Sequence, residues 1–557
     1  MASLLLPMAT LSLLLSPTSP QCHHARGPSC SKAAPAPGTH ALGWGFDVTR
    51  LELMGRVLGV IDVPSSPSCH LCRDLLAGGR LRRVPRGVAR WHSGRRCHQG
   101  TQVAQGTMAL ATAVSAGQEV ARGWKVGLGV IGGRVGKGVV ALAGSHSRMA
   151  EFGLQRQRED RLELLRLRLS CVHYWSWVSP SARPTADFLR ALRGLPHRFS
   201  VSTAAAFGEL VAAYGTHYVV GARAGGRLVS TTALRSCQAS LGATGARQVA
   251  DCLAIEVAAG GGAARAGATA SECRRARAGN LGNASFHETY AERMVEVEGG
   301  GGHYDNGDGN TDNHHGDLLY GRPEDFSRWL SSLPTAPGVV GVELRPLHTL
   351  LKQGDPRRAA LRAAIAHYVT WRGLRINCSH PCGGQRGANF PKLAEHCQCS
   401  CVASATVTSS CCSRHRGMGR VTVTVREGEG WRGDHLSATD AYVKAALEGG
   451  RGERRTRTLW NQQRPRWDQR LELGVLELPP GTHLRLEVWD SDNGWDDDLL
   501  GTCLVTPEPG TRRGLSCFPG GGRLTFDLEL TCGPALGGPF CQDYVPQPPS
   551  QDGGFYR

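Results

Sequence analysis

Seven aspartates with metal-binding potential lie in two short segments near the carboxyl end of the 557-residue chain. They are Asp434 and Asp440 in the first segment, and Asp490, Asp492, Asp496, Asp497 and Asp498 in the second. Each segment adjoins an alternating apolar run that is typical of a β-strand, so the two can form loops at one end of a β-sandwich. Carboxylates brought together in this way repel one another, whereas Ca²⁺ takes about six to eight oxygen ligands and neutralises them. The segments therefore predict a calcium site, and the alternative is an acidic turn at a strand end.

Two tryptophans accompany these aspartates. Trp431 lies beside the first segment and Trp495 lies inside the second. Exposed indoles favour the interface between water and a membrane. We interpret both as membrane anchors that dock once Ca²⁺ cancels the negative charge, and the alternative is that either packs beneath a loop.

Other residues that could carry chemistry are less convincing. His217 invites a catalytic role, but the chain has no G-x-S-x-G, H-E-x-x-H or P-loop motif, so we expect a buried, hydrogen-bonded histidine and no enzyme. Asp308, Asn310 and Asp312 imitate the start of an EF-hand, yet Leu319 stands where the bidentate Glu is needed. A solvated loop is the favoured interpretation of that segment.

The cysteines indicate an oxidising compartment. There are 20 of them, none before Cys22, and a reducing cytosol would not maintain so many disulfides. A cluster between Cys378 and Cys412 has too few apolar neighbours for a core, which predicts a small disulfide module over residues 377–415. Zinc is the competing interpretation, but the alternating Cys397-Gln-Cys-Ser-Cys401 is not paired-thiolate spacing.

The amino terminus and the charge agree with secretion. Residues 1–20 combine apolar leucines with small residues and prolines, as a signal peptide does, and no later segment has the roughly 18 apolar residues of a spanning helix. The net charge of +17 then indicates anionic membranes or matrices as partners rather than nucleic acid, with scattered solvated arginines as the alternative. Asn283-Ala-Ser is a candidate glycosylation site, and Asn377-Cys-Ser is a weaker one.

The elements that must position these residues fall into an α+β arrangement. Residues 21–376 mix helical and alternating patterns as one large domain, with a helix expected from Asp355, an N-cap followed by proline, to Trp371. Residues 416–532 contain short alternating runs, which predict an all-β sandwich. Residues 533–557 form a Pro- and Gly-rich tail tethered by Cys541 and otherwise loose.

Several segments of the large domain resemble the membrane attack complex/perforin (MACPF) family. The signature residues are Tyr214, Gly215, Thr216, His217 and Tyr218, followed by Gly225 and Gly226. The resemblance continues in Cys69-His-Leu-Cys72, Trp124-Lys-Val-Gly-Leu and Leu499-Leu-Gly-Thr-Cys503. It implies a bent antiparallel sheet flanked by two helical clusters, then an epidermal-growth-factor-like module and a C2 sandwich.

The acidic loops resemble those of synaptotagmin-type C2 domains. Asp490-x-Asp492-x5-Asp498-Leu-Leu-Gly is similar to their third loop, and Ser437-Ala-Thr-Asp-Ala-Tyr-Val-Lys is similar to their first. The resemblance implies that the Ca²⁺ ligands are Asp434, Asp440, Asp490, Asp492 and Asp498. Asp497 is an additional contact, and Asp496 is the weakest candidate.

Two segments are candidate membrane hairpins. In Leu162-Glu-Leu164 and Leu165-Arg-Leu-Arg-Leu169, leucines alternate with charged residues, so a strand there would present leucines to lipid and arginines to water. We assign the first hairpin to residues 144–172, with Met149–Asp160 helical in the stored form, and an amphipathic helix or edge strand is the alternative. The second, residues 256–287, rests on the resemblance alone. Glycines 299–302 stand where the family bends its sheet.

Together these features predict a secreted pore-forming cytolytic protein. The resemblance implies storage in cytolytic granules, Ca²⁺-dependent binding to the plasma membrane of a target cell, homo-oligomerisation and a β-barrel pore. A complement-like hetero-oligomeric component and a non-lytic calcium-dependent membrane-binding protein are the alternatives. Phe207, Val220 and Arg223 depart from the family pattern, and the last two put the contacts between subunits in doubt.

Overall fold

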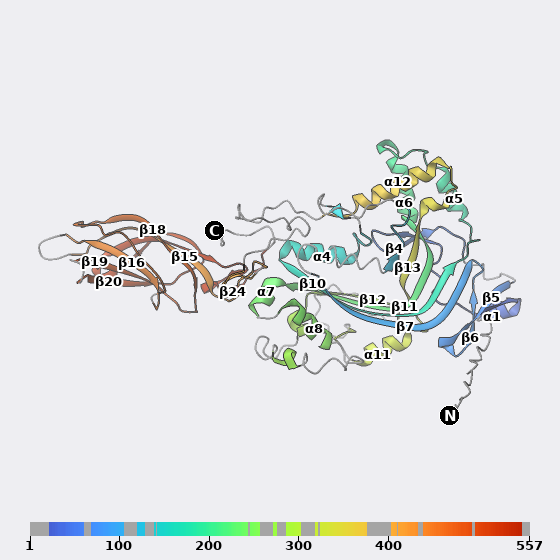
Figure 1. Ribbon diagram of the computed structural model, residues 1–557, viewed down its shortest axis with the longest axis horizontal. Coiled ribbons are helices and arrows are strands. Elements are labelled where there is room, and N and C mark those ends of the chain that lie inside the picture. Colours follow the sequence, from blue (N-terminus) through green and yellow to red (C-terminus); the bar gives the residue numbers. More distant parts are fainter. Residues whose placement is uncertain are drawn as a thin grey trace, which may run out of the picture.

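The computed structural model is elongated, with a mixed domain at one end and a β-sandwich at the other (Figure 1). It describes residues 22–60, 68–104, 120–128, 139–140, 142–242, 245–256, 271–275, 286–301, 318–320, 323–375, 403–408, 410–432, 438–449, 451–492 and 496–547. The candidate glycosylation site Asn283 and the expected signal peptide lie outside these residues. Within the described part of the chain, no helix is both long and apolar enough to cross a membrane.

An eight-stranded sheet forms the centre of the mixed domain. Its strands run in the order β4-β3-β11-β10-β7, with β12 and β13 also pairing with β11 and β8 pairing with β13. The bounds are β3 Trp44–Asp47, β4 Glu52–Arg56, β7 Val88–Ala104, β8 Ala121–Arg122, β10 Leu162–Val178, β11 His217–Arg235, β12 Arg293–Glu298 and β13 Gly338–Pro346. All of these pairs are antiparallel except β13 with β8, and the long strands bend along their length (Figure 1).

Helices cover the sheet at three places (Figure 1). One end carries α5 Ala186–Arg193, α6 Ala204–Tyr214 and α12 Pro356–Trp371. The convex side carries α7 Ser236–Leu241, α8 Ala246–Glu256, α10 Phe286–Thr289 and α11 Pro323–Ser332, and α4 Arg148–Glu159 lies on the other side. The expected helix at Asp355 is confirmed, because the Asp355 carboxylate accepts a 3.0 Å hydrogen bond from the Arg357 N–H and Pro356 occupies the first turn.

The first candidate hairpin is placed differently from the expectation. Met149 to Glu159 is indeed helical, in α4, but residues 162–172 already belong to the central strand β10 rather than to a stored helix. The alternating run is strand because it pairs on both sides, with β7 and with β11. Most of the second candidate, residues 256–287, lies outside the described residues.

Glycines allow the bend of the sheet. Gly299 directly follows β12 and has a φ of +79°, and a Cβ there would lie 2.2 Å from the Gly225 carbonyl oxygen. A Cβ on Gly225 would lie 2.0 Å from the carbonyl oxygen of Cys171 in β10. The Trp329 indole N–H donates to the Gly299 carbonyl at 2.8 Å. Three strands therefore approach too closely for any side chain, which explains the glycines physically.

A small sheet joined by disulfides is formed by segments that lie before β3 and after β4 in the chain. Its order is β1-β5-β6-β2, and beside it lie α1 and a short turn of helix, η1. The bounds are β1 Cys22–Arg26, α1 Pro28–Lys32, β2 Ala34–Pro35, β5 Ser68–Asp74, η1 Leu75–Ala77 and β6 Arg80–Val84. Disulfides Cys22–Cys72 and Cys30–Cys69 join its elements, in agreement with an oxidising compartment.

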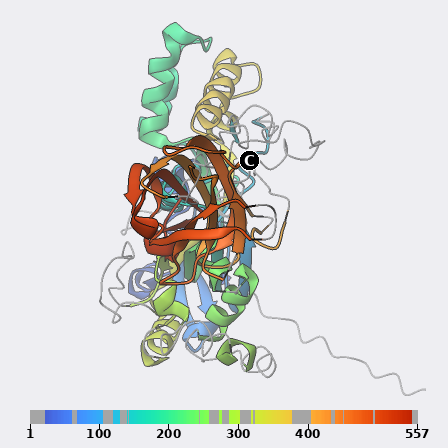
Figure 2. The same cartoon turned by 90° about the vertical axis from the view of Figure 1, so that its left-hand side faces the viewer.

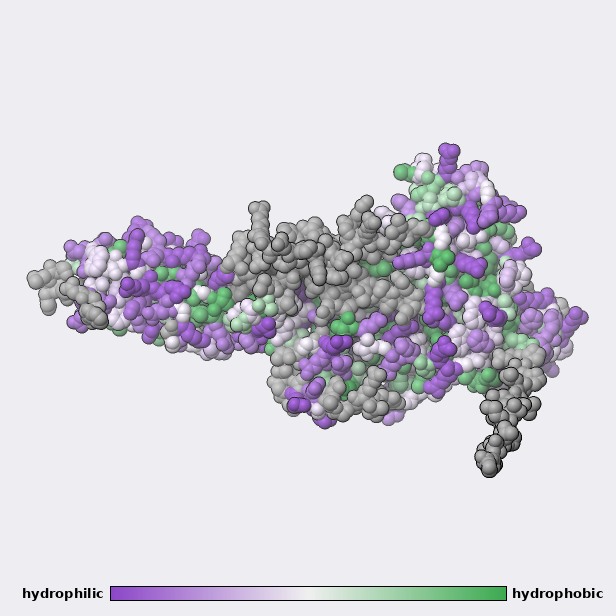
Figure 3. All heavy atoms as spheres, viewed as in Figure 1, coloured by the Kyte–Doolittle hydropathy of each residue, from purple (hydrophilic) through white to green (hydrophobic). Residues whose placement is uncertain are grey.

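The carboxyl-terminal domain is the expected β-sandwich, and Figure 2 looks at it from the sandwich end of the molecule. One sheet has the order β18-β15-β22-β21 and the other β17-β16-β19-β20. The bounds are β15 Met418–Glu429, β16 Ala441–Leu447, β17 Arg451–Arg455, β18 Arg466–Glu477, β19 Leu484–Asp490, β20 Asp498–Val505, β21 Gly510–Cys517 and β22 Arg523–Cys532. Inward residues such as Val423, Leu486 and Phe526 are buried, while hydrophilic residues cover most of the outer surface (Figure 3).

The cysteine cluster is not self-contained. Cys412 forms a disulfide with Cys237 of α7, so the segment before the sandwich is bonded to the sheet domain. No free cysteine occurs among the described residues. Residues 377–402 of the expected module lie outside the described part, and the interpretation of that stretch stays a prediction.

The described part of the tail, residues 533–547, is more ordered than expected. Leu536–Gly537 (β23) pairs with Asp543–Tyr544 (β24), and Cys541 is bonded to Cys532. The Tyr544 hydroxyl donates to the Asp160 carboxylate at the end of α4, and the Gln547 N–H donates to the same carboxylate at 3.1 Å. Tyr544 and Gln547, which follow the sandwich in the chain, therefore contact Asp160 between α4 and β10.

Candidate functional site

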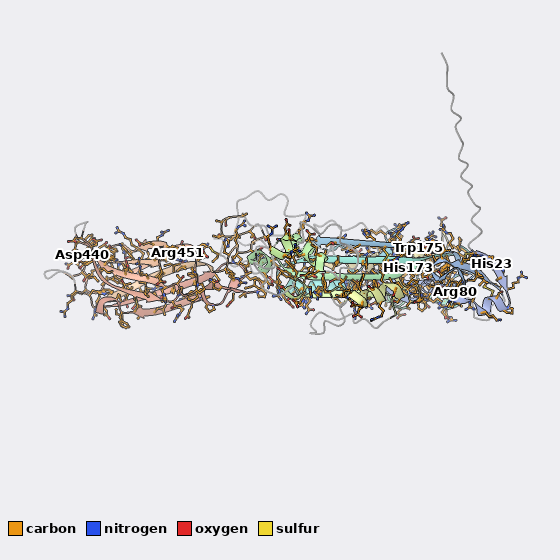
Figure 4. The ribbon with its side chains drawn as sticks, turned by 90° about the horizontal axis from the view of Figure 1, so that it is seen from below. His23, Arg80, His173, Trp175, Asp440 and Arg451 are labelled. Carbon is orange, nitrogen blue, oxygen red and sulfur yellow. A yellow bond between two sulfur atoms is a disulfide. The ribbon has the colours of Figure 1, made fainter. Side chains whose placement is uncertain are left out.

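The candidate calcium site is built by three neighbouring strands of one sandwich sheet. In the register of β16 with β19, Ala441 pairs with Asp490, and in that of β19 with β20, Asp490 pairs with Asp498. Asp440 immediately precedes β16, so three of the predicted ligands come from sequence segments some 50 residues apart and meet at one end of the sheet. Figure 4 shows Asp440 at the end of the sandwich that points away from the mixed domain.

Hydrogen bonds hold the two acidic segments against each other. The Asp490 carboxylate accepts from the Asp440 backbone N–H at 2.7 Å, and the Asp440 carbonyl accepts from the Ser491 N–H at 2.9 Å. The Asp440 carboxylate in turn accepts from the Asn461 N–H at 2.6 Å. Asp490 is only 6% exposed, and a buried carboxylate beside others is costly unless donors or a cation compensate it.

Asp497 is fixed by its own partners. Its carboxylate accepts from the Tyr442 hydroxyl at 2.7 Å and from the Asp492 N–H at 3.1 Å. Burial, together with the hydrogen bond to this carboxylate, raises the pKa of Tyr442 to about 12, so the phenol stays a donor at physiological pH. These bonds tie the backbone at Asp492 and the strand β16 to Asp497.

The predicted ligands divide into three groups. Asp440, Asp490, Asp492, Asp497 and Asp498 lie at the same end of the sandwich, and Asp496 is exposed beside them. Asp434 lies outside the described residues. Among the residues that are described, no group of three His, Cys, Asp or Glu side chains is already arranged to hold a metal. The all-oxygen donor set nevertheless fits a hard cation such as Ca²⁺, and the ligand assignment stays a prediction.

The interpretation of Trp431 as a membrane anchor does not fit its packing. The indole is 8% exposed, its N–H donates to the Pro519 carbonyl at 2.8 Å, and its ring covers Gly428 and Gly522. It is part of the sandwich core, because a loop folds over it, which is the alternative stated above. Trp495 lies outside the described residues, so its anchor role stays a prediction.

Tyr442 and Asn461 are participants that the sequence analysis missed. The signal for Tyr442 was its position two residues after Asp440 on a strand, which places both near the same loop. Asn461 carries no comparable signal, because it reaches Asp440 from the loop after β17 with φ +55°. Only the folded loop brings it there.

The signature histidine is buried and hydrogen-bonded, which confirms the expectation. His217 is fully buried, its Nε2 lies 2.8 Å from the Trp124 carbonyl oxygen and its Nδ1 lies 2.7 Å from the Thr216 hydroxyl. Burial lowers the pKa of His217 to about 4, so the ring is neutral and joins two chain segments.

The other signature residues serve packing as well. Gly215 has φ +76°, and a Cβ there would lie 2.4 Å from the Phe46 carbonyl carbon. Tyr214 meets Phe188 edge to face at 5.0 Å, and the hydroxyl of the buried Tyr218 lies 3.5 Å from that of Thr349. The motif therefore fixes the turn between the end of α6 and the start of β11.

Comparison with known families now defines the class of protein. The model of the MAC/Perforin domain matches residues 33–376, and the model of the C2 domain matches residues 419–516. The chain therefore belongs to the MAC/Perforin domain family, with an α+β fold that includes a C2 β-sandwich.

Relatives of the whole chain are perforins. The sequence is 38% identical to human (Homo sapiens) Perforin-1 over 541 residues, which covers 94% of this chain and 93% of the relative. It is 35% identical to Perforin-1 of Rattus norvegicus over 556 residues, covering 98% and 97%. Among solved structures, GNIP1Aa from Chromobacterium piscinae aligns over 84% of this chain and 79% of its own, with 13% identity and a TM-score of 0.43.

Proposed function

We propose that this protein is a secreted, calcium-dependent pore-forming protein that binds a target membrane through its C2 domain, oligomerises and inserts β-hairpins as a transmembrane barrel. Family membership and the likeness to perforins support a pore-forming, membrane-binding protein. The observation that carries the finer proposal is the topology of the sheet. Ala104 at the end of β7 pairs with Leu164 near the start of β10, and Leu162 pairs with Arg235 at the end of β11.

This topology puts both long connections at one end of the sheet. One connection joins the end of β7 to the start of β10. The other joins the end of β11 to the start of β12, where Arg293 pairs with Thr232. If the parts of the connecting segments next to these strands were to extend as strands, they would lengthen two existing antiparallel pairs. A closed barrel is the form in which strands satisfy their backbone groups in lipid.

The C2 domain supplies the proposed trigger. Asp440, Asp490, Asp492 and Asp498 would hold Ca²⁺ together with Asp434, and Asp497 would make an additional contact. Bound Ca²⁺ supplies positive charge that allows these acidic loops to approach anionic headgroups. Trp495 is then the proposed membrane anchor. Protonation of the carboxylates at acidic pH would weaken the site, which suits storage in cytolytic granules before release.

Leakage from liposomes tests the proposal. We expect the purified protein alone to release a trapped dye at neutral pH only with Ca²⁺, and the double variant Asp490→Ala, Asp492→Ala to release none. Asp187→Ala is the matched control, since its side chain is exposed on α5, far from the sandwich, and it should behave as wild type. Calcium-dependent binding without release would mean a non-lytic membrane protein or a component of a hetero-oligomer. Release that is independent of Ca²⁺ would contradict the trigger.

A further inference from the structure

Two aromatic side chains outside the acidic segments are exposed at the end of the sandwich that carries the candidate calcium site. In the described part of the chain, the exposed Trp and Phe side chains are Trp371, Trp460 and Phe518, with exposed fractions of 62%, 64% and 71%. Trp371 ends α12 in the mixed domain, whereas Trp460 lies between β17 and β18 and Phe518 directly follows β21. We call Trp460 and Phe518 the aromatic rim.

Hydrogen bonds attach Trp460 to the candidate site through both of its neighbours in the chain. The Leu459 N–H donates to the Ala441 carbonyl at 2.9 Å, and the Asn461 N–H donates to the Asp440 carboxylate at 2.6 Å. The backbone of Trp460 is therefore fixed beside a predicted calcium ligand. Because its indole is mostly exposed, it contributes little to the core of the sandwich and is available to a partner.

The turn that carries Phe518 packs against the same end of the sandwich. The Pro519 carbonyl accepts the Trp431 indole N–H at 2.8 Å, and Gly520 lies so close to the Leu500 carbonyl that no Cβ would fit there. Leu500 is near the start of β20, the strand that begins with a predicted ligand. The buried Trp431 thus supports the turn from which Phe518 is exposed.

Arginines at this end favour an anionic partner. Arg464 Nε and Arg523 Nη2 lie 3.4 and 3.5 Å from the Glu429 carboxylate at the end of β15, so one carboxylate serves two guanidinium groups. Arg432 is a further exposed positive charge. Once Ca²⁺ offsets the charge of the acidic segments, these arginines can pair with lipid phosphates. Exposed aromatic groups beside arginines are typical of the interface between water and a bilayer.

We propose that the aromatic rim enters the interface of an anionic phospholipid bilayer when Ca²⁺ fills the acidic loops. The membrane then contacts the β17–β18 loop and the β21–β22 turn as well as the two acidic segments. This inference rests on the proposed function, because it requires that the sandwich dock on a membrane by this end. Burial of the two side chains in the bilayer supplies affinity that charge neutralisation alone does not.

Sedimentation with liposomes of phosphatidylcholine and phosphatidylserine tests this inference. The full protein is used at neutral pH and saturating Ca²⁺, and the lipid concentration for half-maximal binding is measured. We expect Trp460→Ala and Phe518→Ala each to raise it by about tenfold, because the loss of roughly 60 Å² of apolar contact corresponds to about that factor. Trp460→Tyr should keep most of the affinity, since tyrosine also favours the interface.

Trp371→Ala is the matched control. It removes an indole of nearly the same exposure from α12, which lies in the mixed domain (Figure 1), and it should bind as wild type does. Thermal unfolding of all the variants should match wild type, because each substituted side chain is exposed. Wild-type binding by both Trp460→Ala and Phe518→Ala, or an equal loss in Trp371→Ala, would overturn the inference and leave the proposed function standing. Failure of the wild-type protein to bind the liposomes with Ca²⁺ would instead overturn the proposed trigger, and this inference with it.

Discussion

At the scale of single residues, burial separates side chains that are chemically alike. Trp431 and Trp495 have equal claims as anchors from their positions beside acidic loops, yet Trp431 is a core residue with its N–H bonded to a carbonyl. Asp490 is buried while Asp498 is exposed, although both belong to one acidic motif. The neighbours that produce these differences come from other loops, such as the one that carries Pro519.

Trp431 provides a direct test of this distinction. Trp431→Phe keeps most of the packing but loses the hydrogen bond to Pro519, and we expect it to lower the free energy of unfolding by about 1–2 kcal/mol. Calcium-dependent binding to liposomes, measured by sedimentation, should stay at the wild-type level. Loss of binding by a variant whose thermal unfolding is only slightly changed would restore Trp431 as an anchor. Trp495→Phe is the comparison, since there binding is expected to fall.

His217 makes stability depend on pH. Its pKa of about 4 in the folded protein lies below the ordinary value of 6.5, so the unfolded chain binds more protons between these values. The free energy of unfolding should therefore fall by about 3 kcal/mol as pH drops from about 6.5 to about 4, and then level off.

Denaturant titrations at several pH values check this dependence. In His217→Gln the free energy of unfolding should depend less steeply on pH across that window. Part of the dependence should remain, because burial and nearby arginines also lower the pKa of His348 to about 4. A variant with the wild-type slope would show that other groups carry the pH dependence.

At the scale of elements, the bend of the sheet depends on glycine. Gly299→Val would place a Cβ 2.2 Å from the Gly225 carbonyl at a φ of +79°, so β12 would have to separate from β11. We expect a loss of about 3 kcal/mol or more in the free energy of unfolding, measured by chemical denaturation. Gly301→Ala is the matched control, because the nearest atom to a Cβ there is 3.7 Å away and its φ is not positive. Equal stability of the two variants would contradict this account of the bend.

At the scale of the whole molecule, a disulfide joins the parts. Cys237 on α7 and Cys412 before the sandwich are separated by 175 residues, and α7 directly follows β11, from which one connection to the proposed membrane hairpin begins. The tail adds a second link, because the Tyr544 hydroxyl donates a hydrogen bond to Asp160 at the end of α4. The disulfide and this hydrogen bond both lie at the end of the sheet from which the β7–β10 and β11–β12 connecting segments begin.

Removal of the Cys237–Cys412 disulfide should be costly. A disulfide that closes so long a loop lowers the conformational entropy of the unfolded chain. The double variant Cys237→Ser, Cys412→Ser should therefore lose about 4–5 kcal/mol of unfolding free energy. Denaturation under non-reducing conditions measures the loss, with peptide mapping to verify the other disulfides. Cys503→Ser, Cys517→Ser, which opens a separation of only 14 residues, is the control and should lose less. A reversed order of the two losses would contradict the loop-closure account.

Features that depend on local patterns can be predicted before the fold is known. Alternation in Val421–Val425 and its counterparts predicted the sandwich, Asp355-Pro356 predicted the start of α12, and the family signature predicted the sheet domain. The sequence also predicted that aspartates far apart in the chain would meet at one end of the sandwich, by the resemblance of their segments to two C2 loops. The sandwich and the start of α12 follow from periodicity and capping, which neighbouring residues dictate, whereas the sheet domain and the ligand set were implied by resemblance.

The partners that distant residues find depend on the packing of the folded chain. Several contacts join segments whose sequences give no sign that they will meet. They are the disulfide between Cys237 and Cys412, the packing around Trp431, the hydrogen bond from Asn461 to Asp440 and that from Tyr544 to Asp160. The same holds for the central sheet, since the alternation in β10 fixes two faces of the strand but not which neighbouring residues share them. Register between strands makes that choice, and register is set by the packing of the whole sheet.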